Sequence, residues 1–575
     1  MKKNIENTAG LKATQIRELE NLYLYRTPSE ELVSEAQVEA LVSISHDIRR
    51  QVALLINRDG KTIYVIVGDA QGIVIPETPG YSARPGQLKG LRCVHTHLNR
   101  ESLSRDDLTD LALLRLDFMA AVTMADDGSV ERIYPAHILP SEDGEPYEVM
   151  PPISIDSLSM DCTVMILALE SELASNNSLY RAEAGEEKAL LIHVATDAKR
   201  AAENINTGGS MISGTDGNAL NLNINCRTDI ADSRASLDEL EELCRTSNIK
   251  VIGTAIQRRK MIDPKFVVGK GKLADLTIHA IQKYATMMIF DTELTPAQIR
   301  SITDFVEMKV IDRTQLILDI FARRAKSREG KLQVELAQLK YLMPRLITKN
   351  TAMSRLTGGI GGRGPGETKL EINRRRVREK ITLLGKEIEQ IRKQRNQQRA
   401  KRNRKQVPVI SIVGYTNAGK STLLNTLTKS KITAEDKLFA TLDPSSRRLR
   451  FPRDIEVIIT DTVGFIQNLP GELMEAFHAT LEELEDADIL LHVVDISNPR
   501  YSQQMQSVDK IIQKLELDAI PVIYVFNKQD KIDISIFDNP WLLNQGILIS
   551  ATNQETLKPL VSRLEEMVIS QQKRY

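Results

Sequence analysis

The residue types and spacing of one glycine-rich octapeptide suit the binding of a nucleoside triphosphate. It reads Gly-Tyr-Thr-Asn-Ala-Gly-Lys-Ser and directly follows an apolar run at residues 409–413. In such a turn the backbone N–H groups point at the phosphates, the lysine reaches the outer phosphates and the serine hydroxyl ligates Mg²⁺. We therefore expect a P-loop that binds phosphate through Lys420 and Mg²⁺ through Ser421. The residues assigned to it are Gly414, Tyr415, Thr416, Asn417, Ala418, Gly419, Lys420, Ser421 and Thr422.

Two downstream segments carry residues that would complete this site. Thr441 lies in a polar loop, where a threonine can close the Mg²⁺ shell, and Asp461 follows an apolar run and can hold Mg²⁺ through a water molecule. The N–H group of Gly464 can contact the γ-phosphate. Lys420, Thr441 and Gly464 are therefore the candidate catalytic residues. The other nucleotide-binding candidates here are Phe439, Ala440, Leu442, Asp443, Thr462 and Val463.

Two further apolar runs, each typical of a buried strand, end in residues that favour guanine. These residues are Asn527, Lys528, Gln529 and Asp530 after the first run, and Ser550 and Ala551 after the second. The Asp530 carboxylate can accept two hydrogen bonds from guanine, whereas adenine would leave a buried carboxylate unpaired. A backbone N–H at Ser550-Ala551 would meet guanine O6. Together these elements predict a GTPase domain over residues 407–575, with a parallel sheet flanked by helices.

Two residues of this domain bear on hydrolysis. Phe465 stands directly after Gly464, where many small GTPases carry the glutamine that orients the attacking water, so intrinsic hydrolysis should be slow. Phe465 can also simply pack beneath the switch. Asn417 occupies a P-loop position where an asparagine can help to coordinate K⁺, or it can serve only as a turn residue.

Several stretches closely resemble the HflX family of bacterial ribosome-associated GTPases. They are residues 414–423, 438–444 and 461–466, and upstream residues 310–314, 329–339 and 358–368. The resemblance covers roughly residues 187–575. It implies a translational switch that binds GTP and GDP, docks on the large ribosomal subunit and can split stalled or idle ribosomes.

Residues 326–405 combine two heptad-like apolar patterns with a glycine-rich connector. The first pattern is Leu332, Leu336, Leu339, Met343 and Leu346, and the second is Val377, Ile381, Leu384, Ile388 and Ile391. Such spacing predicts two helices packed as an antiparallel coiled-coil hairpin. The connector, residues 358–366, is either a tip whose glycines let the backbone approach another surface or a mobile hinge.

Charge in this hairpin favours an RNA partner, although the chain as a whole is nearly neutral. Residues 374–405 hold fourteen Lys or Arg against three Glu, while the formal net charge of the chain is −1. A charge run is usually a solvated helix face, but this density beside a glycine tip favours a polyanion. The candidate rRNA contacts are Arg363, Arg374, Arg375, Arg376 and Arg378.

The remaining composition indicates an α/β multidomain protein of the cytoplasm. The 575 residues, 42% of them hydrophobic, can fill three or four cores. The four cysteines show no metal-like or disulfide-like spacing, and no apolar run is long enough to span a bilayer. Residues 187–325 predict a small α/β domain, interrupted at about 203–231 by a mobile insert rich in Asn, Gly and Ser.

Residues 1–180 form an extension outside that resemblance and predict an α+β domain. They contain His95 and His97 and, after a gap of six residues, Ser104 followed by Asp107. This pattern resembles the JAB/MPN metallopeptidase fold, which implies that His95, His97 and Asp107 bind zinc. The gap is shorter than usual, and residues 49–51, where a water-activating glutamate would stand, read Arg-Arg-Gln. We interpret the extension as a degenerate, noncatalytic copy of that fold; the alternatives are an active zinc peptidase and a chance similarity.

Two functions therefore compete. The first is a GTP-hydrolysing switch that binds the large ribosomal subunit and acts in ribosome splitting, rescue or biogenesis, with the extension as an adaptor. The second is a zinc metallopeptidase-like enzyme whose activity the GTPase module regulates.

Overall fold

The computed structural model describes residues 5–76, 78, 81, 87–139, 145–155, 158, 160–181, 187–196, 218–306, 308–346, 369–403, 407–428, 438–439, 445–466, 484–532 and 546–572. Within these ranges no helix is long and apolar enough to cross a bilayer. The chain forms two compact units, residues 1–190 with 262–288 and residues 191–261 with 289–575. The expected residues Ala440, Thr441, Leu442, Asp443 and Arg363, and the connector 358–366, lie outside the described residues.

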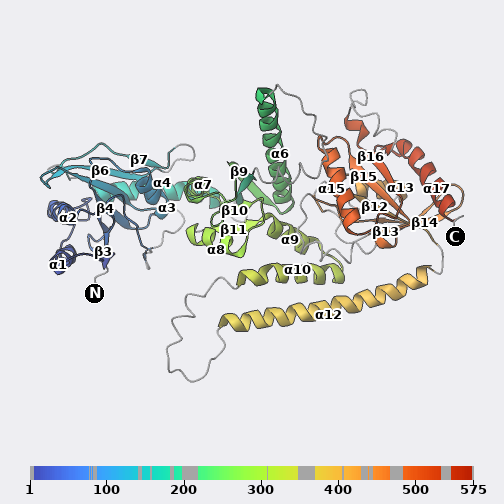
Figure 1. The fold of residues 1–575 in the computed structure, drawn as a ribbon, viewed down its shortest axis with the longest axis horizontal. Coiled ribbons are helices and arrows are strands. Elements are labelled where there is room, and N and C mark those ends of the chain that lie inside the picture. Colours follow the sequence, from blue (N-terminus) through green and yellow to red (C-terminus); the bar gives the residue numbers. More distant parts are fainter. Residues whose placement is uncertain are drawn as a thin grey trace, which may run out of the picture. The chain divides into compact units, whose positions relative to one another are not determined.

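A seven-stranded mixed sheet, in the order β1-β3-β2-β4-β5-β6-β7, forms the centre of the first unit (Figure 1). Its strands are β1 (Ile5–Glu6), β2 (Val52–Asn57), β3 (Thr62–Val67), β4 (Leu91–His97), β5 (Phe118–Met124), β6 (Val130–Ile138) and β7 (Tyr147–Val149). The helices of this unit are α1 (Ala13–Asn21), α2 (Glu35–Ile48), α3 (Arg105–Leu114), α4 (Cys162–Arg181) and α7 (Lys270–Gln282). The predicted α+β arrangement of the extension is confirmed.

Alternation along the central strands separates two apolar layers. The even-numbered positions of β2 pack in the layer that contains Leu41 of α2. Its odd-numbered apolar positions pack in the layer that contains Leu111 of α3. In β4, Val94 belongs to the first layer and Cys93 to the second. Because side chains alternate along a strand, His95 and His97 lie on the α3 side of the sheet.

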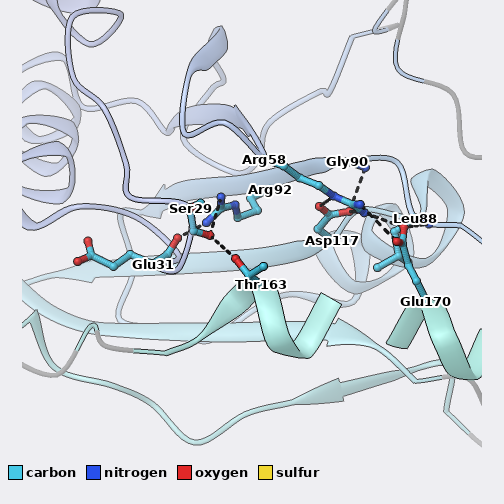
Figure 2. A network of polar contacts seen from close by, with 9 residues as sticks. All are labelled: Ser29, Glu31, Arg58, Leu88, Gly90, Arg92, Asp117, Thr163 and Glu170. Carbon is cyan, nitrogen blue, oxygen red and sulfur yellow. Dashed lines mark hydrogen bonds and ion pairs between the residues drawn. The ribbon is translucent and has the colours of Figure 1, made fainter. Parts of the chain in front are cut away.

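An ion-pair network around the buried Asp117 ties α4 to this sheet (Figure 2). Asp117, whose side chain is fully buried, accepts hydrogen bonds from Arg58 Nε at 2.7 Å and from the Gly90 N–H at 3.0 Å. Arg58 also donates to Glu170 of α4 at 2.8 Å. Nearby, the buried Arg92 donates to backbone carbonyl oxygens of the loop before α2. The network therefore links the β2–β3 turn, the start of β4 and α4.

The predicted small α/β module has a four-stranded sheet in the order β11-β10-β8-β9. Its elements are β8 (Glu187–Thr196), α6 (Asn218–Thr246), β9 (Ile249–Arg259), β10 (Met287–Phe290), α8 (Pro296–Phe305), β11 (Lys309–Asp312) and α9 (Arg313–Arg324). The insert expected as a loop at 203–231 is helical from Asn218 onward. The loop prediction is wrong there because no glycine or proline interrupts residues 218–246.

Helices α10 (Arg328–Leu346) and α12 (Lys369–Asn403) lie side by side and form the predicted hairpin (Figure 1). One ion pair joins Glu335 to Lys380 and another joins Arg328 to Glu387, so the two helices run antiparallel. Leu384 of the predicted seam is 5% exposed, whereas its neighbour Leu383 is 56% exposed. The most buried apolar residues of α10 are Val334, Ala337 and Tyr341, which the heptad pattern did not select. They are buried because α10 packs against α9 as well as α12.

The carboxy-terminal domain has a six-stranded sheet in the order β13-β14-β12-β15-β16-β17. Its elements are β12 (Val409–Gly414), α13 (Lys420–Thr428), β13 (Ser445–Arg450), β14 (Glu456–Asp461), β15 (Ile489–Asp495), α15 (Tyr501–Lys514), β16 (Val522–Asn527), β17 (Gly546–Leu548) and α17 (Lys558–Gln572). All neighbouring strands are parallel except β13 and β14. The carboxyl ends of the parallel strands therefore meet at one edge, where open α/β sheets bind ligands.

Candidate nucleotide site and a second cluster

The loop between β12 and α13 requires glycine near both of its ends. Gly414 has φ +150°, and a Cβ atom there would lie 2.2 Å from the carbonyl oxygen of Val493. Gly419 has φ +93°, and a Cβ atom there would lie 2.3 Å from Asn527 Nδ2. Larger residues would collide, so glycine lets the loop stay close to the strand ends. The loop opens directly into α13, and a helix N-terminus preceded by such a turn binds phosphate.

Lys420 and the two expected Mg²⁺ residues lie together at the start of α13. Lys420 is 6% exposed, and its Nζ donates to the Tyr415 carbonyl oxygen at 2.8 Å. Burial lowers the pKa of Lys420 to about 8, against the opposing effect of the Asp461 charge. Ser421 Oγ donates to Asp461 Oδ2 at 2.6 Å. A hydroxyl and a carboxylate oxygen held this close are hard ligands of the kind Mg²⁺ prefers, so the residues fit the ion.

Asn527 joins the P-loop to the segment expected to contact the base. Its Nδ2 donates to the Ala418 carbonyl oxygen at 2.8 Å, and its Oδ1 accepts from the Ala551 N–H at 2.8 Å. Ser550 Oγ donates to Asp530 Oδ1 at 2.6 Å, and this hydrogen bond lowers the pKa of Asp530. Asp530 is exposed, not buried as expected from the sequence.

The P-loop backbone pairs with the segment that contains Phe465. The Thr416 N–H donates to the Phe465 carbonyl oxygen at 2.8 Å, and the Phe465 N–H donates to the Gly414 carbonyl oxygen at 3.1 Å. Phe465 is 3% exposed, so its ring packs inside the domain. Asn417 is exposed with φ +61°, a conformation that asparagine adopts more readily than most residues. This backbone agrees with a turn role for Asn417.

Two contacts link this site to the α/β module, and sequence reasoning missed both. Tyr415 Oη donates to Glu239 Oε1 of α6 at 2.7 Å, and Glu239 pairs with Arg313 at the start of α9 at 3.0 Å. The rings of Phe439 and Phe321 of α9 meet edge to face, with centroids 4.6 Å apart. Tyr415 and Glu239 are 176 residues apart, so no local pattern reveals their contact.

A glycine loop after a central parallel strand, a serine–aspartate pair and two adjoining base-side loops define a P-loop GTPase. The chain is 48% identical over 334 residues to the GTPase HflX of Caldanaerobacter subterraneus subsp. tengcongensis, covering 77% of that protein and 58% of this one. It belongs to the HflX family of GTPases, and it hydrolyses GTP.

Further comparisons agree with this assignment. Family models match at residues 234–322 (GTP-binding GTPase N-terminal), 324–402 (GTP-binding GTPase Middle Region) and 409–528 (50S ribosome-binding GTPase). The GTPase HflX of Escherichia coli K12 is 44% identical over 297 residues, which are 70% of it and 52% of this chain. A GTP-binding protein from Sulfolobus solfataricus, solved with GDP, is 23% identical over 67% of this chain and 99% of its own, with a TM-score of 0.34. That likeness is too low to support a structural argument.

The candidate rRNA contacts of α12 differ in exposure. Arg375, Arg376 and Arg378 are exposed, whereas Arg374 is half-buried. A shallow hollow around Leu383 is lined in part by Arg375, Arg378 and Lys386. Positive charge therefore lies on the side of α12 that faces away from its seam with α10.

The three expected zinc ligands of the extension also converge. His95 Nε2 and His97 Nε2 are 2.9 Å apart, and each is 3.3 Å from an oxygen of Asp107. All three side chains are buried. The N–H and hydroxyl of Ser104, which caps α3, both donate to Asp107. The fold thus brings β4 and the start of α3 together, while the JAB/MPN resemblance stays a prediction.

The position expected for a catalytic glutamate holds an amide. Gln51 stands directly before β2, two residues ahead of Ala53, which pairs with His95. An amide carries no basic group that could take a proton from water at neutral pH. This geometry gives no support to the peptidase alternative.

Proposed function

We propose that this GTPase is a translational switch whose helical hairpin docks on rRNA of the large ribosomal subunit, in ribosome splitting, rescue or biogenesis. The observation that carries the proposal is the exposed basic face of α12. The match of residues 409–528 to a model described as 50S ribosome-binding GTPase supports the same partner.

The two faces of α12 have different tasks. Leu384 and the rest of the predicted seam are buried or half-buried against α10, so they hold the hairpin together. Residues 374–405 carry fourteen Lys or Arg and three Glu, a net charge of 14 − 3 = +11. Among them Arg375, Arg376 and Arg378 are exposed, where they can follow phosphates without unpacking the seam.

A triple charge reversal, Arg375→Glu with Arg376→Glu and Arg378→Glu, tests the docking surface. Binding to purified large subunits should be lost, because each neutralised phosphate releases counterions, and the salt dependence of the remaining binding should flatten by about 0.7–0.9 per phosphate contact removed. Basal GTP turnover should persist because none of these residues lies at the P-loop.

The matched control reverses three exposed basic residues elsewhere, Arg448→Glu with Lys558→Glu and Arg563→Glu, whose side chains are 75%, 71% and 60% exposed. This control should cosediment with large subunits as the wild type does. If both variants lose binding equally, the loss reflects the net charge of the protein and not the hairpin. If neither variant loses binding, the hairpin is not the docking surface.

The nucleotide site supports Mg²⁺–GTP as its ligand. Ser421 and Thr441 would ligate the Mg²⁺, Asp461 would hold it through water, Lys420 would reach the phosphates and the Gly464 N–H would contact the γ-phosphate. Lys420→Ala or Ser421→Ala should abolish productive Mg²⁺–GTP binding while the fold persists, because both side chains act on phosphate charge. Wild-type turnover in either variant would contradict these roles.

Guanine recognition rests on Asp530, together with the Ser550-Ala551 loop beside it. Asp530→Asn should weaken GTP binding by roughly 1–3 kcal/mol, because the amide presents a donor to one of the two donors of guanine. Calorimetric titration measures this loss, and unchanged affinity would exclude the assignment.

K⁺ is the second proposed cofactor, coordinated in part by Asn417 near the phosphates. Turnover should then be faster in KCl than in NaCl, because a fixed cation stabilises phosphate charge in a site with Phe465 in place of glutamine. Equal rates in the two salts would leave Asn417 a turn residue only.

A further inference from the structure

We infer that Thr416 is a further catalytic residue for GTP hydrolysis, and that its hydroxyl orients the water molecule that attacks the γ-phosphate. The inference rests on the proposed placement of the γ-phosphate beside Lys420 and Gly464. It goes beyond that placement because it assigns a side chain to the attacking water. It is supported by the position of Thr416, by its hydroxyl and by the side chain of Phe465.

The side chain of Thr416 lies where the groups proposed for the γ-phosphate meet. A Cβ atom on residue 464 would lie 2.8 Å from Thr416 Cγ2 and 2.9 Å from Lys420 Nζ. Both side chains therefore border Gly464 at one point. Lys420 is the group proposed for the phosphates, and the Gly464 N–H is the group proposed for the γ-phosphate. Thr416 thus lies at the end of the site where the γ-phosphate is attacked.

The hydroxyl of Thr416 is buried without a hydrogen-bond partner in the described part of the chain. Thr416 is 7% exposed, and no described donor or acceptor pairs with its Oγ1. The hydroxyl of Thr462, which is also buried, donates to the Ile412 carbonyl oxygen at 2.6 Å. Burial of a polar group without a hydrogen bond is unfavourable, so we expect a water molecule or a ligand oxygen beside Thr416.

The backbone fixes the position of this hydroxyl. The Thr416 N–H donates to the Phe465 carbonyl oxygen at 2.8 Å, and the residue before it, Tyr415, forms a parallel bridge with Phe465. A β-branched side chain such as that of threonine also has restricted rotation about its first bond. A polar group that is fixed before the reaction stabilises the transition state without the cost of reorganisation.

Phe465 cannot orient the attacking water. It stands where many small GTPases carry the glutamine that does so, its side chain has no polar atom, and it is 3% exposed. A threonine hydroxyl has one donor and two acceptor lone pairs. Thr416 can therefore accept a hydrogen bond from the water while it donates one to a γ-phosphate oxygen.

The reaction needs no proton from Thr416. The water oxygen forms a bond to the γ-phosphorus while the bond from this phosphorus to the β–γ bridging oxygen breaks, and GDP leaves with the electron pair of that bond. One proton of the water passes to a γ-phosphate oxygen, so the products are GDP and inorganic phosphate. Thr416 keeps its own proton and sets only the direction of attack.

The experiment compares Thr416→Val, which removes the hydroxyl and keeps the shape, with Thr416→Ser, which keeps the hydroxyl. The full chain, with Mg²⁺ and KCl, is mixed in excess over radiolabelled GTP to measure the rate of a single turnover. Fluorescent GDP and a non-hydrolysable GTP analogue measure affinity. Thr416→Val should slow turnover about ten- to a hundredfold. Both affinities should stay within about threefold of the wild type, and Thr416→Ser should retain most of the rate.

The matched control is Ser411→Ala. Ser411 is also buried, and its hydroxyl also has no partner among the described residues. It lies within β12, between β14 and β15, so its loss should leave turnover unchanged. The inference is overturned by a wild-type rate in Thr416→Val, by equal losses in Thr416→Val and Thr416→Ser or Ser411→Ala, or by a loss of affinity that accounts for the slower turnover.

Lys420→Ala distinguishes this inference from the proposed placement of the phosphates. If Lys420→Ala binds and hydrolyses GTP as the wild type does, the placement is wrong and the role of Thr416 is wrong with it. If Lys420→Ala is inactive while Thr416→Val keeps the wild-type rate, the placement stands and only the role of Thr416 is wrong.

Discussion

Two buried clusters of histidine and carboxylate, one in each unit, balance their charges in opposite ways. In the second unit Asp291 accepts hydrogen bonds from His193 Nδ1 at 2.6 Å, from Ser236 Oγ at 2.6 Å and from Arg313 at 2.9 Å. Glu239 pairs with the same arginine from its other side. In the first unit, Asp107 faces two imidazoles, and within the described residues no lysine or arginine pairs with it.

This difference decides which cluster has room for a ligand. The guanidinium of Arg313 carries a permanent charge and fixed donors, so it occupies the place a cation would take. The cluster around Asp107 has converging acceptors instead. The two clusters therefore differ in whether a Lys or Arg cation of the described chain pairs with the carboxylate.

The largest expected effect comes from removing the Arg313 guanidinium, the cation of the Asp291 cluster. Arg313→Met should destabilise the α/β module by about 3–5 kcal/mol, because it leaves the buried Asp291 and the half-buried Glu239 without the cation that they share. Hydrogen exchange in β8 and α9 measures the loss. The matched change in the other cluster, His97→Gln in metal-free protein, should cost only about 1 kcal/mol, the value of one hydrogen bond. If Arg313→Met and His97→Gln destabilise the protein equally, the two clusters do not differ in how their charges are balanced.

Metal should stabilise only the first unit. Free Zn²⁺ at a hundred times its dissociation constant should add about 2.7 kcal/mol to the opening free energy of α3, since the ion binds the folded state. The exchange of β8 and α9 should stay unchanged. Protection of both regions by Zn²⁺ would remove the distinction between the clusters.

Acid should weaken the Asp291 cluster. Burial raises the pKa of Asp291, but the His193 hydrogen bond and the Arg313 charge outweigh it and lower the pKa to about 2, against an ordinary 3.8. Because its pKa is lower in the folded state, the ionised Asp291 adds about 2 kcal/mol to the free energy of unfolding above about pH 4. This contribution is lost as the pH falls through 2, where Asp291 becomes protonated in the folded state. Wild type should therefore lose more stability between pH 5 and 2 than Asp291→Asn. Parallel acid unfolding curves would contradict this origin.

The smallest effect concerns the link between the Asp291 cluster and the P-loop. Tyr415→Phe removes the hydrogen bond to Glu239, and its coupling with Glu239→Gln in a double-mutant cycle should be about 1 kcal/mol. The readout is hydrogen exchange in residues 236–245 of α6. If the effects of the two changes are additive, the hydrogen bond between Tyr415 and Glu239 does not stabilise α6.

Much of the nucleotide site could be predicted because its chemistry is local. Gly414, Gly419, Lys420 and Ser421 act through one turn and the first residues of one helix, so their spacing is visible in the chain. The hairpin was predictable for a similar reason, since a seam repeats at helical intervals. The helix over residues 218–231 was missed because polar composition was taken for a loop, although nothing there breaks a helix.

The sequence by itself determined the class of protein, the base-side motifs and the pairs of near neighbours in the Asp107 cluster, which are His95 with His97 and Ser104 with Asp107. Local backbone geometry is set by nearby residues, so these signals survive without a fold. Only the tertiary structure decided that Arg313 fills the centre of the Asp291 cluster and that Tyr415 reaches Glu239. Contacts between distant segments depend on how sheets and helices pack, and packing leaves no fixed spacing in the sequence.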